Sequence, residues 1–350
     1  MRILRAPAFS VGRSRERIEG GREMSRSRAA LGAACLSMTV ATAQAAPATS
    51  AGEQVGLTAG YPLPTGIVVA VDTFTAGRAD RPNAPDVMGN IPFVVWASPY
   101  RLFGGQIQPV VSFPTALIGT RNPAPLPNRD VSAMYNPLLA SALAWDLGNG
   151  LGVSYLLGAY LPVSDRGSLG LGLDGTPLLP QAASATLRQS FAATYVGDGH
   201  YNLTASLSYG LTLDPRARFG GAVGRSLGPI GQADGLGLDL TLVKRFGRFE
   251  IGPVAYGSLD LAVDRRDPLY RTYQKTGQFA AGALVGYSFD RFIVQVYLAR
   301  DIVARQTRTR GGQVQDNEET RGWFRLAVPL AAPSAGQAAE AGSRPLMSKD

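Results

Sequence analysis

The sequence predicts an all-β protein, an antiparallel up-and-down transmembrane β-barrel of about twelve strands that follows a cleaved signal peptide. Three observations lead to this fold class. Apolar and polar residues alternate with a period of two through most of the chain. Short and long connectors alternate along the chain between the segments that show this pattern, as in outer-membrane barrels. After residue 45, no apolar run reaches the roughly 20 residues that a membrane-spanning helix needs.

Residues 1–45 are expected to be a secretory signal peptide. Arginines at 22, 26 and 28 precede an apolar stretch at 29–41, and Ala43-Gln44-Ala45 fits a small-x-small cleavage site. Met24 is a candidate for the true start, because the arginine-rich prefix before it is not needed for export. The apolar stretch is too short for a transmembrane anchor. A lipoprotein site at Cys35 fits poorly, since Gly32 stands where leucine is expected.

We expect residues 46–65 to form a periplasmic segment, residues 66–330 the barrel and residues 331–350 a flexible tail. The alternation is clearest where Leu236, Leu238, Leu240 and Leu242 share one face while Gly237, Asp239 and Thr241 share the other. Several segments are as long as the roughly 9–11 residues of a tilted membrane strand. The predicted strands are 66–76, 90–98, 105–114, 136–147, 151–163, 185–196, 201–213, 235–245, 249–263, 276–288, 292–304 and 321–330.

The connectors indicate the orientation of the barrel. Short turns that contain glycine, asparagine or aspartate at 148–150, 197–200, 246–248 and 289–291 predict tight hairpins. Long connectors lie between them, at about 77–89, 115–135, 164–184, 214–234, 264–275 and 305–320. Because outer-membrane barrels have short periplasmic turns and long external loops, both termini are expected in the periplasm.

Aromatic residues gather near the ends of the predicted strands, as the two girdles of a membrane barrel would. They are Phe93, Trp96, Tyr100, Phe103, Trp145, Tyr195, Phe246, Phe249, Phe289, Phe292 and Trp323. The alternative is a secreted soluble β-sandwich or lipocalin-like barrel, whose apolar faces point inward. Twelve long hairpinned strands are many for one soluble barrel, so the sequence favours the membrane.

Charge and composition exclude several other classes. The net charge of +8 belongs mostly to the first 45 residues, which hold eight Arg and three Glu, so the remainder carries only +3. We therefore expect no nucleic-acid partner. The single cysteine, Cys35, excludes a disulfide scaffold, and ample apolar content excludes a disordered chain.

If leucine faces lipid, the opposite face of each strand lines the lumen or its rim. Both signs of charge occur there, so strong ion selectivity is not implied. Two alternatives for the interior are compatible with the sequence: an open pore, or a plugged barrel in which these charges neutralise one another. The candidate lumen-lining residues are Arg188, Asp239, Glu250, Asp260, Asp264, Gln295, Asp301 and Arg325, together with Arg321.

The sequence does not predict an enzyme. His200 is the only histidine, it lies in a predicted periplasmic turn, and the mature chain would have no cysteine. A hydrolase needs a nucleophile, a base and an orienting group, so an outer-membrane lipid hydrolase is the least favoured alternative. We expect no catalytic residues, no cofactor and no metal site. The charged residues at 300–319 are interpreted as a solvated external loop.

Several motifs, taken in order, resemble the phenol meta-degradation-pathway family of outer-membrane proteins. The resemblance covers most of the mature chain. Its motifs mark turns and strand ends and are not a catalytic signature. One departure is the tail 331–350, because many barrels end on an aromatic residue that is recognised during assembly. The motifs are Ala59-Gly-Tyr-Pro-Leu-Pro-Thr-Gly66, Asn136-Pro-Leu-Leu, Ala144-Trp-Asp, Gly158-Ala-Tyr160, the strand Tyr201–Asp214, Ile251-Gly-Pro-Val254 and Arg321–Leu330.

The resemblance implies a channel for passive uptake of small compounds, including aromatic or hydrophobic ones, in the outer membrane of a Gram-negative bacterium. The expected partners are outer-membrane lipid and lipopolysaccharide, the barrel-assembly machinery and small solutes. A structural or adhesive barrel that acts through its external loops is the alternative from another class.

Overall fold

A computed structural model of the chain describes residues 50–81, 84, 86–120, 129–162, 184–197, 200–213, 233–270, 273–308 and 314–331. The expected signal peptide and residues 332–350 of the expected tail lie outside the described residues, as do parts of the long connectors.

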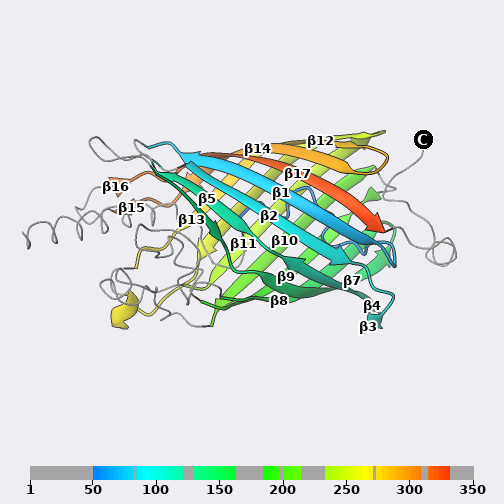
Figure 1. Cartoon of the computed structure of the whole chain (residues 1–350), viewed down its shortest axis with the longest axis horizontal. Helices are drawn as coiled ribbons and strands as arrows, with labels where there is room; N and C mark the ends of the chain where they lie inside the picture. Colours follow the sequence, from blue (N-terminus) through cyan, green and yellow to red (C-terminus); the bar gives the residue numbers. More distant parts are fainter. Residues whose placement is uncertain are drawn as a thin grey trace, which may run out of the picture.

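Twelve antiparallel strands form a closed barrel (Figure 1). β1 pairs with β2 on one side and with the last strand, β17, on the other, and β2 also pairs with β4, which completes the ring. The strands of the wall are β1 (Val68–Ala79), β2 (Asp86–Trp96), β4 (Gly105–Ser112), β7 (Leu138–Gly148), β8 (Leu151–Tyr160), β9 (Thr186–Tyr195), β10 (Tyr201–Thr212), β11 (Gly235–Phe246), β12 (Phe249–Asp260), β13 (Gly277–Ser288), β14 (Ile293–Ala304) and β17 (Glu319–Ala331). The predicted antiparallel barrel of about twelve strands is therefore confirmed.

The shorter elements lie at the two ends of the barrel. The predicted long connector at 115–135 contains a hairpin of β5 (Thr115–Thr120) and β6 (Arg129–Met134), and β5 pairs with the outer half of β2. The 3₁₀ helix η3 (Pro268–Tyr270) and the small hairpin of β15 (Thr307–Arg308) and β16 (Val314–Gln315) lie at the same end (Figure 1). β3 (Arg101–Leu102) lies at the opposite end, with the short turns.

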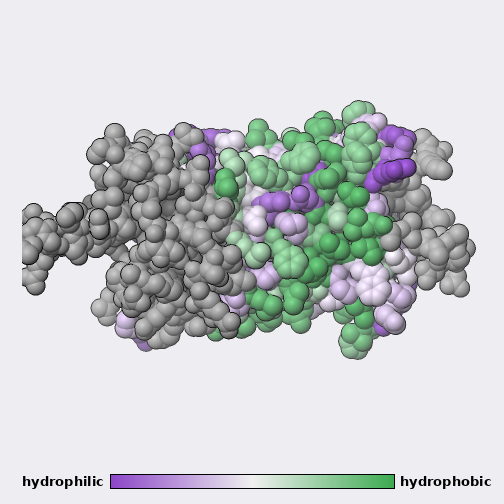
Figure 2. All heavy atoms as spheres, viewed as in Figure 1, coloured by the Kyte–Doolittle hydropathy of each residue, from purple (hydrophilic) through white to green (hydrophobic). Residues whose placement is uncertain are grey.

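The alternation places polar side chains inside and apolar ones outside. On β10, Asn202 and Ser206 are buried, whereas Leu207 is 50% exposed at the middle of the strand. An apolar band therefore covers the face of the barrel shown in Figure 2. Asp72 of β1 is an exposed exception within the wall. A soluble barrel would bury its leucines, so this arrangement is that of a membrane-spanning wall. Among the described residues, no helix is long and apolar enough to cross a membrane.

Most of the predicted girdle residues lie on the outer surface. Tyr100, Phe103, Phe246 and Phe249 are exposed near the short-turn end, where Phe289 and Phe292 stack with their ring centroids 4.5 Å apart. Two predictions were wrong. Trp323 is buried inside the barrel, and Phe93 points into an internal cavity, because both have the inward parity of their strands.

Candidate functional site: a plugged lumen

The segment Ser50–Ile67 lies inside the barrel and is called the plug here. It contacts β14 and β17 at Gly52 and reaches the short-turn end at Tyr61, whose hydroxyl donates to Asp146 of β7 at 3.0 Å. Gly66 then turns the chain into β1. The prediction of a periplasmic segment at 46–65 was therefore wrong for the described residues 50–65. Of the two alternatives for the lumen, the plugged barrel is the one observed.

Two glycines let the plug approach the wall closely. Gly52 and Gly56 have φ angles of +91° and +84°, which side chains with a Cβ rarely adopt. A Cβ at Gly52 would also lie 2.8 Å from the Trp323 ring, and one at Gly56 would lie 2.7 Å from Gln295 Oε1. The turn of the plug at these positions therefore requires glycine on both conformational and steric grounds.

Polar side chains of the wall hold the backbone of the plug. Asp239 of β11 accepts hydrogen bonds from the N–H groups of Gly52 and Gln54, at 2.8 and 3.0 Å. Two residues along the same strand, Thr241 accepts from the N–H of Gly56 at 2.8 Å. The other wall residues that hydrogen-bond to plug backbone are Ser154, Thr194, Asn202, Gln295, Tyr297 and Arg325. Since each buried backbone group needs a partner, the polar lumen supplies what a sheet would otherwise provide.

One ion pair joins the plug to the opposite side of the lumen. The Glu53 carboxylate pairs with the Arg188 guanidinium of β9, and their side chains are only 11% and 4% exposed. Arg188 also donates to the Tyr160 hydroxyl at 3.0 Å and to Ser190 Oγ at 3.1 Å. Because a buried charge without its partner is costly, this contact fixes the plug in place.

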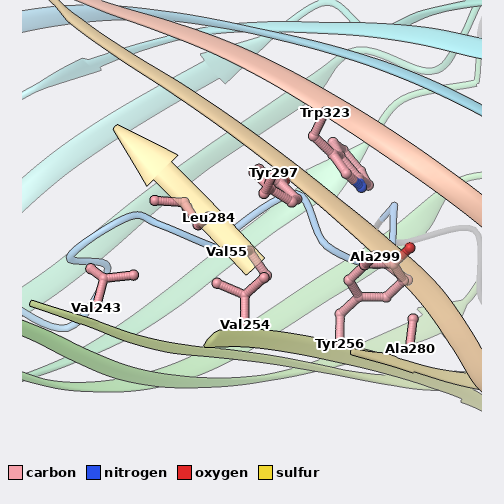
Figure 3. Packing of buried hydrophobic residues seen from close by; sticks show 10 residues of the cluster. Val55, Val243, Val254, Tyr256, Ala280, Leu284, Tyr297, Ala299 and Trp323 are labelled. Atoms are coloured by element: carbon pink, nitrogen blue, oxygen red, sulfur yellow. The ribbon is translucent and has the colours of Figure 1, made fainter. Parts of the chain in front are cut away.

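An apolar contact anchors the plug on the wall formed by β11–β14 and β17. Val55, which is fully buried, inserts among Val243, Leu284 and Tyr297 (Figure 3). Tyr297 stacks on Trp323 with ring centroids 5.3 Å apart, and Tyr256 meets the same ring edge-on. The plug therefore packs tightly against one side of the lumen.

A cavity of about 240 Å³ lies between the plug and the wall, and its lining includes residues of β1, β2, β8 and β9 as well as of β12, β14 and β17. Its β1 and β2 face is apolar and includes Val69, Val71, Phe93 and Val95. Its polar lining includes Gln108, Ser154, Arg188, Gln295 and Arg325. The cavity is therefore amphipathic, with an apolar surface facing polar and charged groups.

The structure brings several of the predicted lumen residues together around the plug. Arg188, Asp239, Gln295 and Arg325 contact the plug directly. Glu250 accepts from Gln295 at 2.6 Å and pairs with Arg245 at 3.3 Å. These side chains all point inward, and two of their charges, on Arg188 and Glu250, are paired with an opposite charge.

Three other predicted residues lie inside, toward the end with the long connectors. Asp301 accepts the N–H of Glu319 at 3.0 Å, and Arg321 pairs with the Glu319 carboxylate at 2.7 Å. Asp260 accepts from the hydroxyl of Tyr273 and from the N–H of Thr276, both at 2.7 Å, which ties the connector after β12 back to the wall. Burial of Tyr273, reinforced by the Asp260 carboxylate, raises the pKa of its hydroxyl and keeps it a donor.

Asp264 is not part of this interior. It lies exposed in the connector after β12, where it accepts the N–H of Arg266 at 2.9 Å. The strand ends at Asp260, three residues before the predicted end at 263, so the parity argument does not extend to Asp264.

Sequence reasoning missed the plug residues themselves, Glu53 and Val55 above all. The available signal was the spacing of Gly52, Gly56 and Gly60 directly before the first strand, since closely approaching backbones require glycine. His200 is exposed in its turn, and the described residues contain no group of three or more potential metal ligands.

Most of the barrel matches a known protein family. The family model described as "Putative MetA-pathway of phenol degradation" matches residues 75–315, well over half of the chain. The chain belongs to this family. The matched range excludes the plug and the closing strand β17. The comparison with curated proteins found no match.

Among solved structures, an outer membrane channel from Pseudomonas putida F1 is similar over 77% of this chain and 98% of its own, with 11% identity and a TM-score of 0.60. A FadL homologue from Pseudomonas aeruginosa is similar over 82% of this chain and 99% of its own, with 7% identity and a TM-score of 0.45. At these identities the first likeness supports the fold alone, which is the twelve-stranded barrel described above.

Proposed function

We propose that this protein is an outer-membrane channel for the passive uptake of small, largely apolar compounds, and that the plug keeps it closed at rest. The observation that carries the proposal is the cavity between the plug and the apolar face of β1 and β2. A dry cavity of about 150 Å³ accommodates benzene, so the 240 Å³ seen here suits a substituted single ring or a short aliphatic chain. Membership of the phenol-degradation family and the fold it shares with an outer membrane channel support the same role.

The plug determines what can pass. It fills one side of the lumen through Val55 and spans the other through the Glu53–Arg188 pair. A water-filled passage for large hydrophilic solutes is therefore closed in this state. Passage requires the plug to move, which costs its hydrogen bonds to the wall.

The direct test is ionic current through the purified protein in planar bilayers. Deletion of residues 46–62 should raise the single-channel conductance severalfold, because it removes the plug and leaves the closed ring of strands. Benzyl alcohol, a neutral single-ring compound, should then reduce the current saturably, and Val71→Asn should weaken this block because it makes the apolar face polar. A plug-deleted barrel that is folded, as judged by faster migration on unheated gels, but carries no current would overturn the proposal.

The orientation in the membrane gives a separate prediction. Arg266 is exposed in the connector after β12, and Arg291 is exposed in the short turn between β13 and β14. In a Cys35-free chain, Arg266→Cys should react with an impermeant thiol reagent on whole cells, whereas Arg291→Cys should react only after the outer membrane is permeabilised. The reverse labelling pattern would invert the topology, and recovery of the protein in the soluble periplasm would refute the membrane location.

A further inference from the structure

Arg325 is a buried cation that has no carboxylate partner among the described residues. Its side chain donates from Nε to Thr73 Oγ1 at 3.0 Å and from Nη1 to Gln295 Oε1 at 3.1 Å. The two remaining contacts go to the plug, from Nη1 to the Val55 carbonyl and from Nη2 to the Glu53 carbonyl at 2.5 Å. With 1% of its surface exposed, Arg325 is held by neutral acceptors alone.

The other buried arginines of the interior differ from Arg325. Arg188 pairs with Glu53, and Arg321 pairs with Glu319. Around the cavity, Arg245 likewise pairs with Glu250. The charged groups that line the cavity therefore cancel except at Arg325, which leaves one positive charge there.

An apolar surface continues from Arg325 toward the short-turn end. Arg325 lies opposite Thr73 in the β1–β17 register, and Thr73 lies opposite Ile91 of β2. The next inward-facing level is Ala327, Val71 and Phe93, and the one after it is Pro329, Val69 and Val95, all of which line the cavity. At about 3.3 Å per residue, this surface extends roughly 13 Å from the guanidinium.

We propose that Arg325 binds the carboxylate of the transported compound, and that the Glu53 and Val55 carbonyls of the plug occupy the carboxylate's place in the closed state. This inference rests on the proposed function and specifies its substrate class. The compounds are monocarboxylates with an apolar body, either one ring or a short chain. The guanidinium offers two parallel N–H donors that match a carboxylate, and the body lies along Val71 and Phe93. A dicarboxylate is disfavoured, because its second charge would lie on the apolar surface.

The same geometry couples binding to opening. Four of the five N–H groups of Arg325 already have acceptors, so a carboxylate that takes two parallel N–H groups must displace at least one acceptor, and the ligand and the closed plug compete for Arg325. A ligand that binds only the open arrangement shifts the population toward it by its own binding free energy. The transported carboxylate therefore promotes displacement of the plug.

The test uses the purified full-length protein and two probes of nearly equal shape, benzoate and neutral benzamide. Benzoate should bind the wild-type protein at least tenfold more tightly than benzamide does. Arg325→Met should abolish this preference, so that benzoate binds no more tightly than benzamide does. Arg325→Lys keeps the positive charge but loses the pair of parallel N–H donors, so its benzoate affinity should lie between those of the wild-type protein and Arg325→Met. Equal affinity for the two probes in the wild-type protein, or benzoate binding that Arg325→Met does not change, would overturn the proposal.

Thiol reactivity in the plug tests the competition separately. Thr58 lines the cavity, so Thr58→Cys in a Cys35-free chain reports exposure of the plug. Benzoate should accelerate its modification, and benzamide should not. In Arg325→Met, benzoate should have no effect. If the plug-deleted barrel conducts, but benzoate binds no more tightly than benzamide and does not accelerate the modification of Thr58→Cys, the proposed carboxylate site is refuted and the proposed channel function is retained. If the plug-deleted barrel does not conduct, the proposed channel function itself is refuted.

Discussion

Loss of either partner of the Glu53–Arg188 pair is expected to convert a mostly closed channel into a mostly open one. Glu53→Gln leaves Arg188 charged and buried as long as the plug remains in place, and Arg188→Met does the same to Glu53. Removing one partner of a buried ion pair costs about 3–5 kcal/mol. Movement of the plug relieves that cost because the remaining charge becomes hydrated. At about 1.4 kcal/mol per factor of ten, the open-to-closed ratio should rise by roughly two orders of magnitude or more.

The double variant Glu53→Gln/Arg188→Met makes the test specific. With neither charge present, the plug has no buried ion to hydrate, so the open fraction should return toward that of the wild-type protein. The measurement is the open probability of single channels in planar bilayers. If the double variant is as open as either single variant, the pair acts only through its shape and hydrogen bonds.

An exposed ion pair provides the control. Arg248 and Asp290 lie 2.7 Å apart in the neighbouring short turns, with side chains that are 51% and 79% exposed. Arg248→Met should leave the open probability unchanged, since solvent screens such pairs. A large effect there would show that any loss of charge disturbs the channel.

Leu207→Arg is expected to have the largest effect on stability. Leu207 is 50% exposed at the middle of β10, between the buried Ser206 and Ser208, so its side chain faces lipid near the centre of the bilayer. An arginine at mid-membrane on the lipid face costs about 2–4 kcal/mol of the free energy of unfolding. Chemical denaturation of the protein folded in lipid vesicles measures this loss.

Leu213→Arg is the matched control. Leu213 follows β10 at its outer end and is 56% exposed, a fraction close to that of Leu207. At the membrane interface, the same substitution costs only about 0–1 kcal/mol, because the guanidinium reaches water. Equal costs at both positions would show that β10 does not cross the membrane with Leu207 at its centre.

The wall of the barrel could be derived from the sequence because it is encoded locally. The predicted strand at 201–213 is β10 at Tyr201–Thr212, and the one at 249–263 begins at Phe249 as β12 does. Period-two alternation assigns each residue to a face, and the short turns place neighbouring strands in register. Alternation also predicted the inward direction of Arg188 and Glu250 without any knowledge of their partners.

Local patterns failed where a residue lies beyond a regular strand or where its strand is longer than expected. Asp264 was assigned to the lumen by continuing the alternation past Asp260, where β12 ends. Trp323 resembled a girdle residue because the predicted strand began at 321, whereas β17 begins at Glu319 and places Trp323 deeper. Its inward direction follows from the parity that it shares with Arg321 and Arg325. Aromatic character indicates neither depth nor face on its own.

The sequence alone determined that this protein is a barrel with a polar interior, since turn chemistry and alternation operate over a few residues. Only the tertiary structure decided that the interior is occupied. The contacts of the plug join Gly52 to Asp239 and Val55 to Arg325, residues that the closed ring of strands brings together across most of the chain. Which acceptors surround Arg325 depends on where the plug lies, and the plug itself has no strand period to reveal its partners. Contacts between residues so far apart in the sequence follow from closure of the barrel, and no local pattern encodes them.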